Sequence, residues 1–496
     1  MIVIMKRQSG ILLHITSLPS PYGIGDLGEE AFRFIDFLSK SGQSIWQILP
    51  LTIPDSIGSP YASSSAFAGN WLLISPDELL KAGLLHKKSL PKTKRVTAIK
   101  YSKVFQERRK LVEKSYEYFR KHASREQSNS FNHFIQYHSK WLNDFGLFMA
   151  LKDHFKGARW FNWPEDIANR EEQAIKYWQK KLDRQIKVYQ YGQWIFFSQY
   201  AKIKKYANKK GIRIFGDIPF FIIHDSVNVW VDRDLFLLDD KYQPLAKSGV
   251  PPDYFSKRGQ LWGDPQYNWE KMKKNNFRWF IRRIKKAENF YDDVRLDHFR
   301  GYSAVWHVDP KSKTSKNGKW VPVPGIEIFR EVKSKFKNLS IIAEDLGYIT
   351  HDVVELKRHY KFPGMRVMQF GFSGKQNNFH LPTNFSTDCV AYTGTHDNDT
   401  TYGWITKSGK TSQKKFALKY AKTDKKHFAW KLIEIGMRSR ACWFVFPIQD
   451  ALNLGSEARM NKPSTKKKNW QWRMKKNALS DELAIKINNL TRSARR

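Results

Sequence analysis

Carboxylate side chains recur at the ends of apolar runs along this 496-residue sequence. The residues at those ends are Asp217, Asp297, Glu344, Asp397 and the neighbouring pair Gln449 and Asp450. Glycosyl chemistry needs such a set: one carboxylate as nucleophile or base and a second kept protonated as general acid. Further groups often stabilise the oxocarbenium-like transition state. The residue types therefore indicate glycosyl chemistry, provided that the fold brings the run ends together.

The stretch VRLDHFRG, residues 294–301, presents the candidate nucleophile, Asp297. Arg295 lies two residues earlier, so on a strand both side chains project to the same side. A cation there keeps a carboxylate ionised at neutral pH, as a nucleophile requires. The structural alternative is that Asp297 only balances Arg295 and Arg300. Carboxylates on other strand ends favour the chemical interpretation, and we expect Arg300 to be the structural partner.

The elements that must position these groups form a regular series. Near-continuous apolar runs that alternate with helix-like segments are typical of buried parallel strands. Eight such runs predict a (β/α)8 barrel, whose active sites lie at the C-terminal ends of the strands. The runs are 11–16, 44–50, 212–220, 292–299, 340–347, 364–372, 389–398 and 441–450, and helix-like segments include 29–42, 325–336 and 351–360.

Two long insertions interrupt the series, because the gaps after the second and third runs far exceed a normal βα loop. We expect one catalytic unit, residues 1–496, with its barrel at about 9–51, 208–220 and 289–475. The first insertion, 52–207, is predicted to be largely helical, for example at 103–123 and 171–207. The second, 221–288, should build substrate-cleft loops at the C-terminal rim. Residues 476–496 read as a basic C-terminal tail.

Composition narrows the class of protein. The 18 Trp, 34 Phe and 21 Tyr suit flat ligands such as sugars or bases, as well as core packing. A net charge of +39 makes contact with polyanions a hypothesis to consider. The charge thickens in 87–103, 282–288 and 464–476, which we interpret as solvated helix faces and loops, so no specific nucleic-acid partner is predicted.

Other patterns argue against cofactors, metals and membranes. GIGDLG, residues 23–28, matches the dinucleotide fingerprint but lacks a strand directly before it and an acid at the end of the next strand. HDNDT, residues 396–400, lacks the glycine and glutamate of a calcium loop. Cys389 and Cys442 lie in apolar runs and suggest no disulfide. No apolar stretch is long enough for a membrane span, and no transit-like extension precedes the barrel, so we expect a cytoplasmic protein or a mature plastid one.

Several longer segments resemble those of the 4-α-glucanotransferases, the family of bacterial amylomaltase and the plastid disproportionating enzyme, related to the α-amylases. The resemblance is carried in order from near the N-terminus to about residue 473. It includes SPYASSSAFAGN (59–70), GDIPFFIIHDSVNVW (216–230), GVPPDYFSKRGQLWGDPQYNW (249–269), RLDHFRGYSAVW (295–306), AEDLG (343–347), GTHDNDT (394–400) and LGSEARMNKP (454–463).

This resemblance implies transfer of α-1,4-glucan segments to the 4-hydroxyl of an acceptor sugar, without a cofactor. By motif, Asp297 resembles the nucleophile, Glu344 the general acid/base and Asp397 the carboxylate that stabilises the transition state. Retaining chemistry of this kind places the first two carboxyl groups roughly 5–5.5 Å apart. Residues that match cleft positions, two of which bracket the reacting sugar (Arg295 and His396), are Tyr61, Asp217, Tyr254, Phe255, Trp262, Arg295 and His396.

Two positions depart from the family pattern. Thr383 in LPTNF stands where the family usually has histidine, and Asp264 in LWGDP stands where it has asparagine. The first puts one substrate contact in doubt and the second bears on acceptor affinity. The partners implied are an α-1,4-glucan donor and a glucose or malto-oligosaccharide acceptor, for a monomer or weak homo-oligomer. Two alternatives stay open: an α-amylase-type hydrolase, and a non-catalytic polyanion-binding protein on the same scaffold.

Overall fold

Eight parallel strands close into a barrel in the computed structural model, which describes residues 6–93, 96–252 and 258–496. Around the barrel the strands run β1-β12-β11-β10-β9-β6-β3-β2, and each overlaps one of the eight predicted runs. The predicted (β/α)8 fold is therefore confirmed. The strands are β1 (Gln8–Leu12), β2 (Ile45–Gln47), β3 (Arg213–Ile218), β6 (Asp293–Leu296), β9 (Ser340–Ala343), β10 (Gly364–Val367), β11 (Cys389–Tyr392) and β12 (Trp443–Pro447).

Helices cover the outside of the barrel, so most strand residues are buried and many are apolar. All five residues of β12, WFVFP, are buried, as expected for a parallel strand that is covered on both faces. Helix α1 (Glu29–Lys40) shows how the cover forms: Ala31, Phe34, Ile35 and Leu38 line its buried stripe. The other long helices that follow or precede barrel strands are α10 (Arg278–Phe290), α11 (Gly325–Lys335), α12 (His351–His359), α15 (Thr411–Ala421), α16 (Phe428–Arg438) and α18 (Asp481–Ser493).

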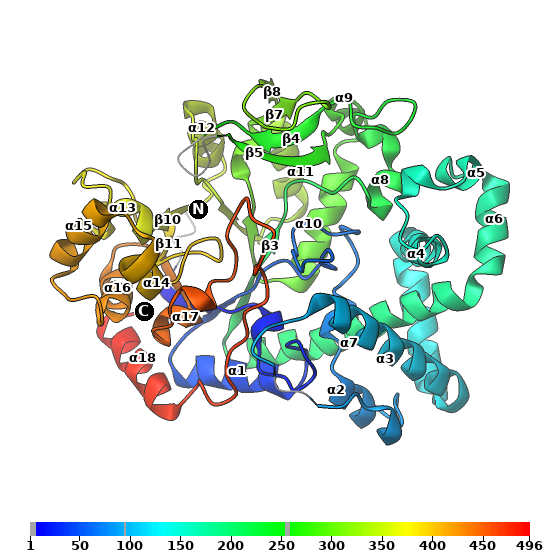
Figure 1. Ribbon diagram of the computed structural model, residues 1–496, viewed down its shortest axis with the longest axis horizontal. Helices are drawn as coiled ribbons and strands as arrows, with labels where there is room; N and C mark the ends of the chain where they lie inside the picture. The colour runs from blue at the N-terminus through cyan, green and yellow to red at the C-terminus, as the bar shows by residue number, and fades with distance from the viewer. Residues whose placement is uncertain (1–5, 94–95, 253–257) are drawn as a thin grey trace.

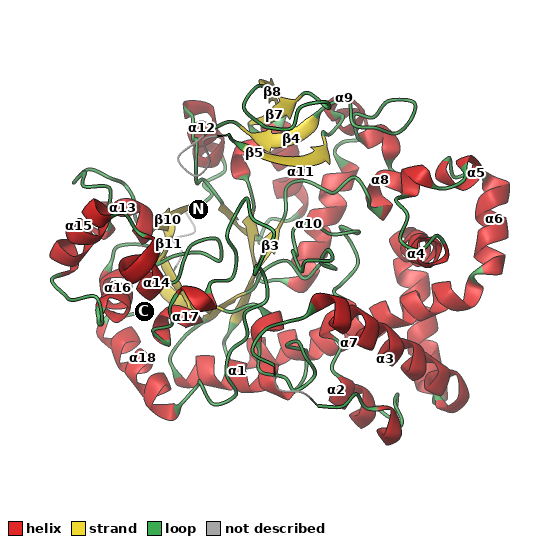
Figure 2. Cartoon of the chain, viewed as in Figure 1, coloured by secondary structure: helices red, strands yellow, loops and turns green. Residues whose placement is uncertain are grey.

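A block of helices stands to one side of the barrel, at the right of Figure 1, and Figure 2 shows that it contains hardly any strand. It comprises α2 (Pro76–Lys81), α3 (Tyr101–His122), α4 (Arg125–His154), α5 (Glu165–Ala168), α6 (Glu172–Lys181) and α7 (Asp183–Lys209). The predicted helical region 171–207 is divided at Leu182, between α6 and α7. Helix α7 leads directly into β3, so the insertion also supplies a wall of the barrel.

A second, antiparallel sheet with strand order β5-β4-β7-β8 lies at the top of Figure 1. Its strands are β4 (Lys247–Val250), β5 (Gln260–Pro265), β7 (Ala304–Val308) and β8 (Lys319–Pro322). It joins the predicted insertion 221–288 to residues 304–322, which the sequence predicts to be part of the barrel. The shorter helices are α8 (Val227–Val231), α9 (Trp269–Lys274), α13 (Met368–Gly371), α14 (Thr401–Gly403) and α17 (Ile448–Ala451).

The basic segment 282–288 is less solvated than its charge predicts. In α10, the buried Arg283 donates to the carbonyl oxygens of Pro219 and Phe220 after β3. Lys286, one turn later, donates to the carbonyl oxygens of Ala66 at 3.1 Å and Ala68 at 3.3 Å. These cations replace water around the carbonyl groups of two loops at the barrel rim. Burial lowers the pKa of Lys286 to about 7.

The C-terminal segment is folded rather than a loose tail. Helix α18 packs between α1 and α16 (Figure 1, red beside blue) with Ala484, Ile487 and Thr491 buried. The Thr491 hydroxyl accepts a hydrogen bond from Gln43 at 2.8 Å. Both cysteines are buried and are not joined in a disulfide. In the part of the chain that the structure describes, no helix is long and apolar enough to cross a membrane.

Candidate active site

Three candidate carboxylates lie on neighbouring strands at the C-terminal rim of the barrel. Strand β6 pairs with β3 on one side and with β9 on the other. The ladder continues one residue past β6 and β9, because the Asp297 amide donates to Ile218 and the Glu344 amide donates to Leu296, both at 3.1 Å. Asp217, Asp297 and Glu344 therefore follow one another along the rim.

Arg295 connects two of these carboxylates. Its Nη2 lies 2.9 Å from Asp297 Oδ1, the pair that the spacing on one strand predicts. Its Nη1 lies 2.6 Å from Asp217 Oδ2, and the Arg295 side chain is only 6% exposed. The guanidinium thus holds the Asp297 carboxyl group in place from the side of β3 by a charge-assisted contact.

Arg300 does not pair with Asp297, contrary to the prediction that it is the structural partner of the VRLDHFRG motif. Its guanidinium carbon lies 3.8 Å above the ring of Trp320 in β8, and its Nη1 donates to the Thr350 hydroxyl at 2.5 Å. The reason is local: His298 adopts the left-handed conformation, with φ of 48°, and a 3-10 turn follows. The chain therefore turns away from the site before Arg300.

The same left-handed turn creates a cradle for Glu344. The backbone N–H of His298 donates to Glu344 Oε2 at 2.8 Å, and that of Leu346 donates to Oε1 at 3.0 Å. Burial raises the pKa of Glu344 to about 8, with the charge of Asp297 acting in the same direction, while Arg295 opposes the rise. At neutral pH Glu344 is therefore mostly protonated, as a general acid requires.

A chain of hydrogen bonds links Asp217 to the loop after β11. The Tyr61 hydroxyl donates to Asp217 Oδ2 at 2.8 Å and lies 3.0 Å from His396 Nε2. Since the tyrosine proton goes to the carboxylate, His396 must donate through Nε2. Burial lowers the pKa of His396, so the ring is neutral with its proton on Nε2. The rings of Tyr61 and His396 are stacked, with centroids 5.3 Å apart.

The third candidate, Asp397, lies in this same loop, residues 394–400, and its side chain is 43% exposed. His396 Nε2 lies 3.5 Å from Asp397 Oδ1, which also accepts a hydrogen bond from Asn461 Nδ2 at 2.6 Å. Arg459 Nη2 donates to the backbone oxygen of Asp397 at 2.6 Å. Asp397 is thus joined to Asp217 and Arg295 through one continuous polar network.

The pair at the end of β12 serves the fold instead. Asp450 is 1% exposed and accepts hydrogen bonds from the Thr393 hydroxyl and from both the amide and the hydroxyl of Thr401. Gln449 donates to the Ala458 carbonyl at 3.2 Å. Both residues hold the loops around β11 in place, so their acidic or polar character has a structural explanation.

The remaining predicted cleft residues are placed as follows. Trp262, in β5, is 39% exposed and meets the ring of His298 edge-on at 4.9 Å. Tyr254 and Phe255 lie outside the described residues. Asp264 follows Trp262 closely, and burial raises the pKa of its carboxyl to about 7. Thr383 is exposed, in a 3-10 turn between β10 and β11.

Two neighbours of Asp397 come from a distant part of the chain and are not predicted from the sequence. Arg459 and Asn461 belong to LGSEARMNKP, a segment that carried the family resemblance but to which no role was given. The motif could have drawn attention to these two residues. Their spacing in the sequence does not predict that they contact a loop about sixty residues away. Within the described ranges, no group of three or more His, Cys, Asp or Glu side chains could hold a metal ion.

Comparisons with known proteins match nearly the whole chain. A family model described as 4-alpha-glucanotransferase matches residues 13–479. A 4-alpha-glucanotransferase from Clostridium butyricum is 45% identical, covering 97% of this chain and 99% of that protein. A chloroplastic/amyloplastic 4-alpha-glucanotransferase from Arabidopsis thaliana is 40% identical over 98% of this chain and 84% of its own length. The structure of an amylomaltase from Streptococcus agalactiae in complex with acarbose superposes with a TM-score of 0.95 at 39% identity, covering 99% of this chain and 100% of the other.

Proposed function

This chain belongs to the 4-alpha-glucanotransferase family, and we propose that Asp297, Glu344 and Asp397 carry its reaction. Its activity is that of a 4-alpha-glucanotransferase, a transferase rather than a hydrolase of the α-amylase type. The proposed substrates are an α-1,4-glucan donor and a glucose or malto-oligosaccharide acceptor. We further propose that the chain acts as one catalytic unit.

One observation carries the assignment of roles. The backbone amide of the residue after Asp297 donates to the Glu344 carboxyl, so the two groups are held side by side by a single turn. Their surroundings differ. The Arg295 guanidinium lies 2.9 Å from Asp297 Oδ1, while burial raises the pKa of Glu344 to about 8. A carboxyl group paired with a cation, next to a buried carboxyl group with a raised pKa, is the arrangement that a nucleophile and an acid require.

The proposed reaction has two displacements at the anomeric carbon. In the first, Asp297 attacks this carbon, the glycosidic bond breaks, and Glu344 gives its proton to the departing 4-oxygen. In the second, the acceptor 4-hydroxyl gives its proton to Glu344 and attacks the same carbon, and the bond to Asp297 breaks. Two inversions retain the α configuration, and Glu344 ends in its initial protonation state.

Asp397 and the Asp217–Tyr61–His396 network have a binding role in this proposal. The carboxylate of Asp397 accepts hydrogen bonds from hydroxyl groups of the reacting sugar, and these bonds strengthen as positive charge develops on the ring. Arg295 and His396 bracket that sugar. Each of these side chains already has a fixed protein partner, so little reorganisation is needed when the sugar binds.

Incubation with maltotriose tests the proposal directly. Transfer yields glucose together with longer oligomers while the number of reducing ends stays constant, whereas hydrolysis raises that number. Asp297→Asn should abolish both outcomes. A steady rise in reducing ends, or turnover by the Asp297→Asn variant that matches the unmodified protein, would contradict the proposed mechanism.

Exclusion of water is proposed to depend on Tyr254 and Phe255, which belong to the Pro-rich segment before β5. Aromatic faces there would stack on acceptor sugars and keep water from the covalent intermediate. Replacing both by alanine should raise the ratio of hydrolysis to transfer, measured as reducing ends against chain-length redistribution. An unchanged ratio would remove this segment from the mechanism.

The location proposed for the protein is the cytoplasm, or the plastid stroma if the chain is a mature form, and the oligomeric state proposed is a monomer or weak homo-oligomer. No specific nucleic-acid partner is proposed. Tight nucleic-acid binding at physiological salt without sugar turnover would instead establish the polyanion-binding alternative.

A further inference from the structure

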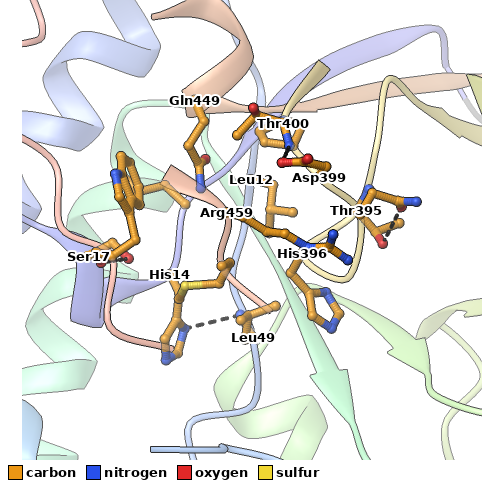
Figure 3. Close-up of a pocket in the computed structure, with 15 residues that line it drawn as sticks. Leu12, His14, Ser17, Leu49, Thr395, His396, Asp399, Thr400, Gln449 and Arg459 are labelled. Atoms are coloured by element: carbon orange, nitrogen blue, oxygen red, sulfur yellow. Dashed lines mark hydrogen bonds between the residues drawn. The ribbon is translucent and has the colours of Figure 1, made fainter. Parts of the chain in front are cut away.

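A pocket of about 30 Å³ lies beside the loop that carries His396 and Asp397, lined by groups from β1, from the loop itself and from the segment after β12. Figure 3 shows His396, Asp399 and Arg459 around this pocket, with His14 and Leu49 at its other side. The loop side chains His396, Asp399 and Thr400 are nevertheless buried, so packing and hydrogen bonds act together to hold the loop.

Hydrogen bonds from residues 459–461 add to this packing. Arg459 Nη2 donates to the Asp397 carbonyl at 2.6 Å, and Asn461 N donates to the His396 carbonyl at 3.0 Å. Arg459 Nε also donates to the Asn461 carbonyl at 2.7 Å, which ties the two donors to each other. The result is a clamp on two consecutive carbonyl groups of the loop.

The clamp reaches the side chain as well. Asn461 Nδ2 donates to Asp397 Oδ1 at 2.6 Å, while no residue in the described ranges donates a hydrogen bond to Asp397 Oδ2. One oxygen is therefore held by the protein and the other is left for a ligand. An exposed carboxylate would otherwise rotate about its side-chain bonds, and fixing it in advance lowers the entropy cost of its contact with the sugar.

We propose that Asn461 and Arg459 are positioning residues for the transferase reaction, which orient Asp397 so that its Oδ2 meets the hydroxyl groups of the reacting sugar. The proposal rests on the role of Asp397 given above. Its structural alternative is that residues 459–461 only close the barrel rim, in which case their loss would lower stability and leave the chemistry of Asp397 intact.

A double-mutant cycle separates these two roles. Asn461→Ala should lower kcat for maltotriose disproportionation by about 10–100-fold, with KM little changed, as is usual when an orienting hydrogen bond to a functional group is removed. In an Asp397→Asn background the same change should have almost no further effect, since the group that it orients has lost its charge. An equal fold-loss in both backgrounds would overturn the proposal.

The affinity for acarbose supplies the cycle with a second readout if turnover by the Asp397→Asn variant is too slow to measure. Calorimetric Kd values for the unmodified protein, Asn461→Ala, Asp397→Asn and the double variant should show the same non-additivity. Asn453→Ala is the matched control, because Asn453 donates to a loop carbonyl at 3.3 Å in the same region without touching residues 394–400. It should leave kcat and the acarbose Kd unchanged.

Asn461→Asp adds a further readout, the pH dependence of activity, which would not change if residues 459–461 had only a structural role. The new carboxyl group would lie against Asp397 Oδ1, with His396 and Arg459 as the other ionisable groups nearby. Two adjacent carboxylates raise the pKa of one of them, and only its protonated form can donate the hydrogen bond that asparagine supplies. Activity relative to the unmodified protein should therefore rise as pH falls.

Arg459→Lys tests the backbone part of the clamp. Lysine keeps the charge but has a single nitrogen, so it cannot reproduce the separate Nε and Nη2 donors that reach the Asn461 and Asp397 carbonyl groups; kcat should therefore fall while the melting temperature changes little. The proposal would be contradicted if the activity of Asn461→Asp relative to the unmodified protein stayed constant across pH and Arg459→Lys kept full activity. Absence of disproportionation by the unmodified protein would instead contradict the proposed function.

Discussion

The protonation state of Glu344 depends on a contest between burial and hydrogen bonding. Two backbone N–H groups and Arg295 stabilise its ionised form, yet burial outweighs them and the nearby Asp297 adds to the rise in pKa. The same turn therefore places the carboxyl group and leaves its proton available. A lone motif such as AEDLG could identify the residue, but only its surroundings decide its charge.

The raised pKa of Glu344 predicts the direction in which activity changes with pH. Glu344 must be protonated to act as the acid, and a group with a pKa of about 8 loses its proton as pH rises through 8. We expect kcat/KM for maltotriose to fall on the alkaline side with that midpoint. Glu344→Gln should lower kcat by about 10²–10⁴-fold and abolish this limb. Glu331→Gln, on the outer helix α11, serves as the control.

Persistence of the alkaline limb in Glu344→Gln would assign it to another group. Lys286 is the candidate, since burial lowers its pKa to about 7 and its ammonium group holds the carbonyl groups of residues 66 and 68. A donor whose leaving group needs no proton, such as an α-glucosyl fluoride, gives a further check. Glu344→Gln should still form the covalent intermediate from it, whereas Asp297→Asn should not.

At the scale of elements, helix α18 shows that a basic terminal segment can form a helix with a buried face. Its buried residues Ala484, Ile487 and Thr491 are spaced three and four apart, which is one face of a helix. The N-cap Ser480 accepts from the Leu483 amide at 3.2 Å, and Lys40 of α1 pairs with Asp481 at 2.6 Å. The segment is therefore a part of the outer helical layer that depends on the barrel for its apolar partner.

Removing one core side chain from α18 should destabilise the protein without changing its chemistry. Ile487→Ala is expected to lower the free energy of unfolding by about 2–5 kcal/mol, because a fully buried isoleucine leaves a cavity. Ile485→Ala is the matched control on the same helix, since that side chain is 52% exposed. Thermal melting at a fixed scan rate measures both, and equal melting temperatures for the two variants would show that α18 is dispensable.

Some features of the fold and of the site can be predicted from the sequence, and others cannot. The eight strands are recognisable because buried parallel strands are apolar on both faces, and Arg295 follows from its spacing to Asp297 on one strand. Arg283 and Lys286 were assigned to solvent because charge is local in the sequence, whereas their carbonyl partners lie in distant loops. Arg300 was misplaced because the left-handed His298 cannot be read from residue types. Asn461 needed a contact between segments that only the closed barrel brings together.

At the scale of the molecule, the net charge of +39 is unbalanced even though many surface cations have acidic partners. An excess of one sign favours expansion of the chain through self-repulsion. We therefore expect the melting temperature to rise between about 10 mM and about 0.15 M NaCl, as the screening length falls from about 30 Å to about 8 Å. KCl should act equally. A falling melting temperature would mean that surface ion pairs outweigh the repulsion.

The pairing of β1 with β12 means that the barrel can close only late in the synthesis of the chain. A ribosome delivers the chain from its N-terminus, yet the edge of β1 that faces β12 has no neighbour until residue 447 has emerged. By then the segments that carry Asp297, Glu344 and Asp397 have all been made, but the loop with Asp397 still awaits residues 459–461. The proposed site is thus completed late, so we expect a partly made chain that ends before residue 459 to lack a competent site.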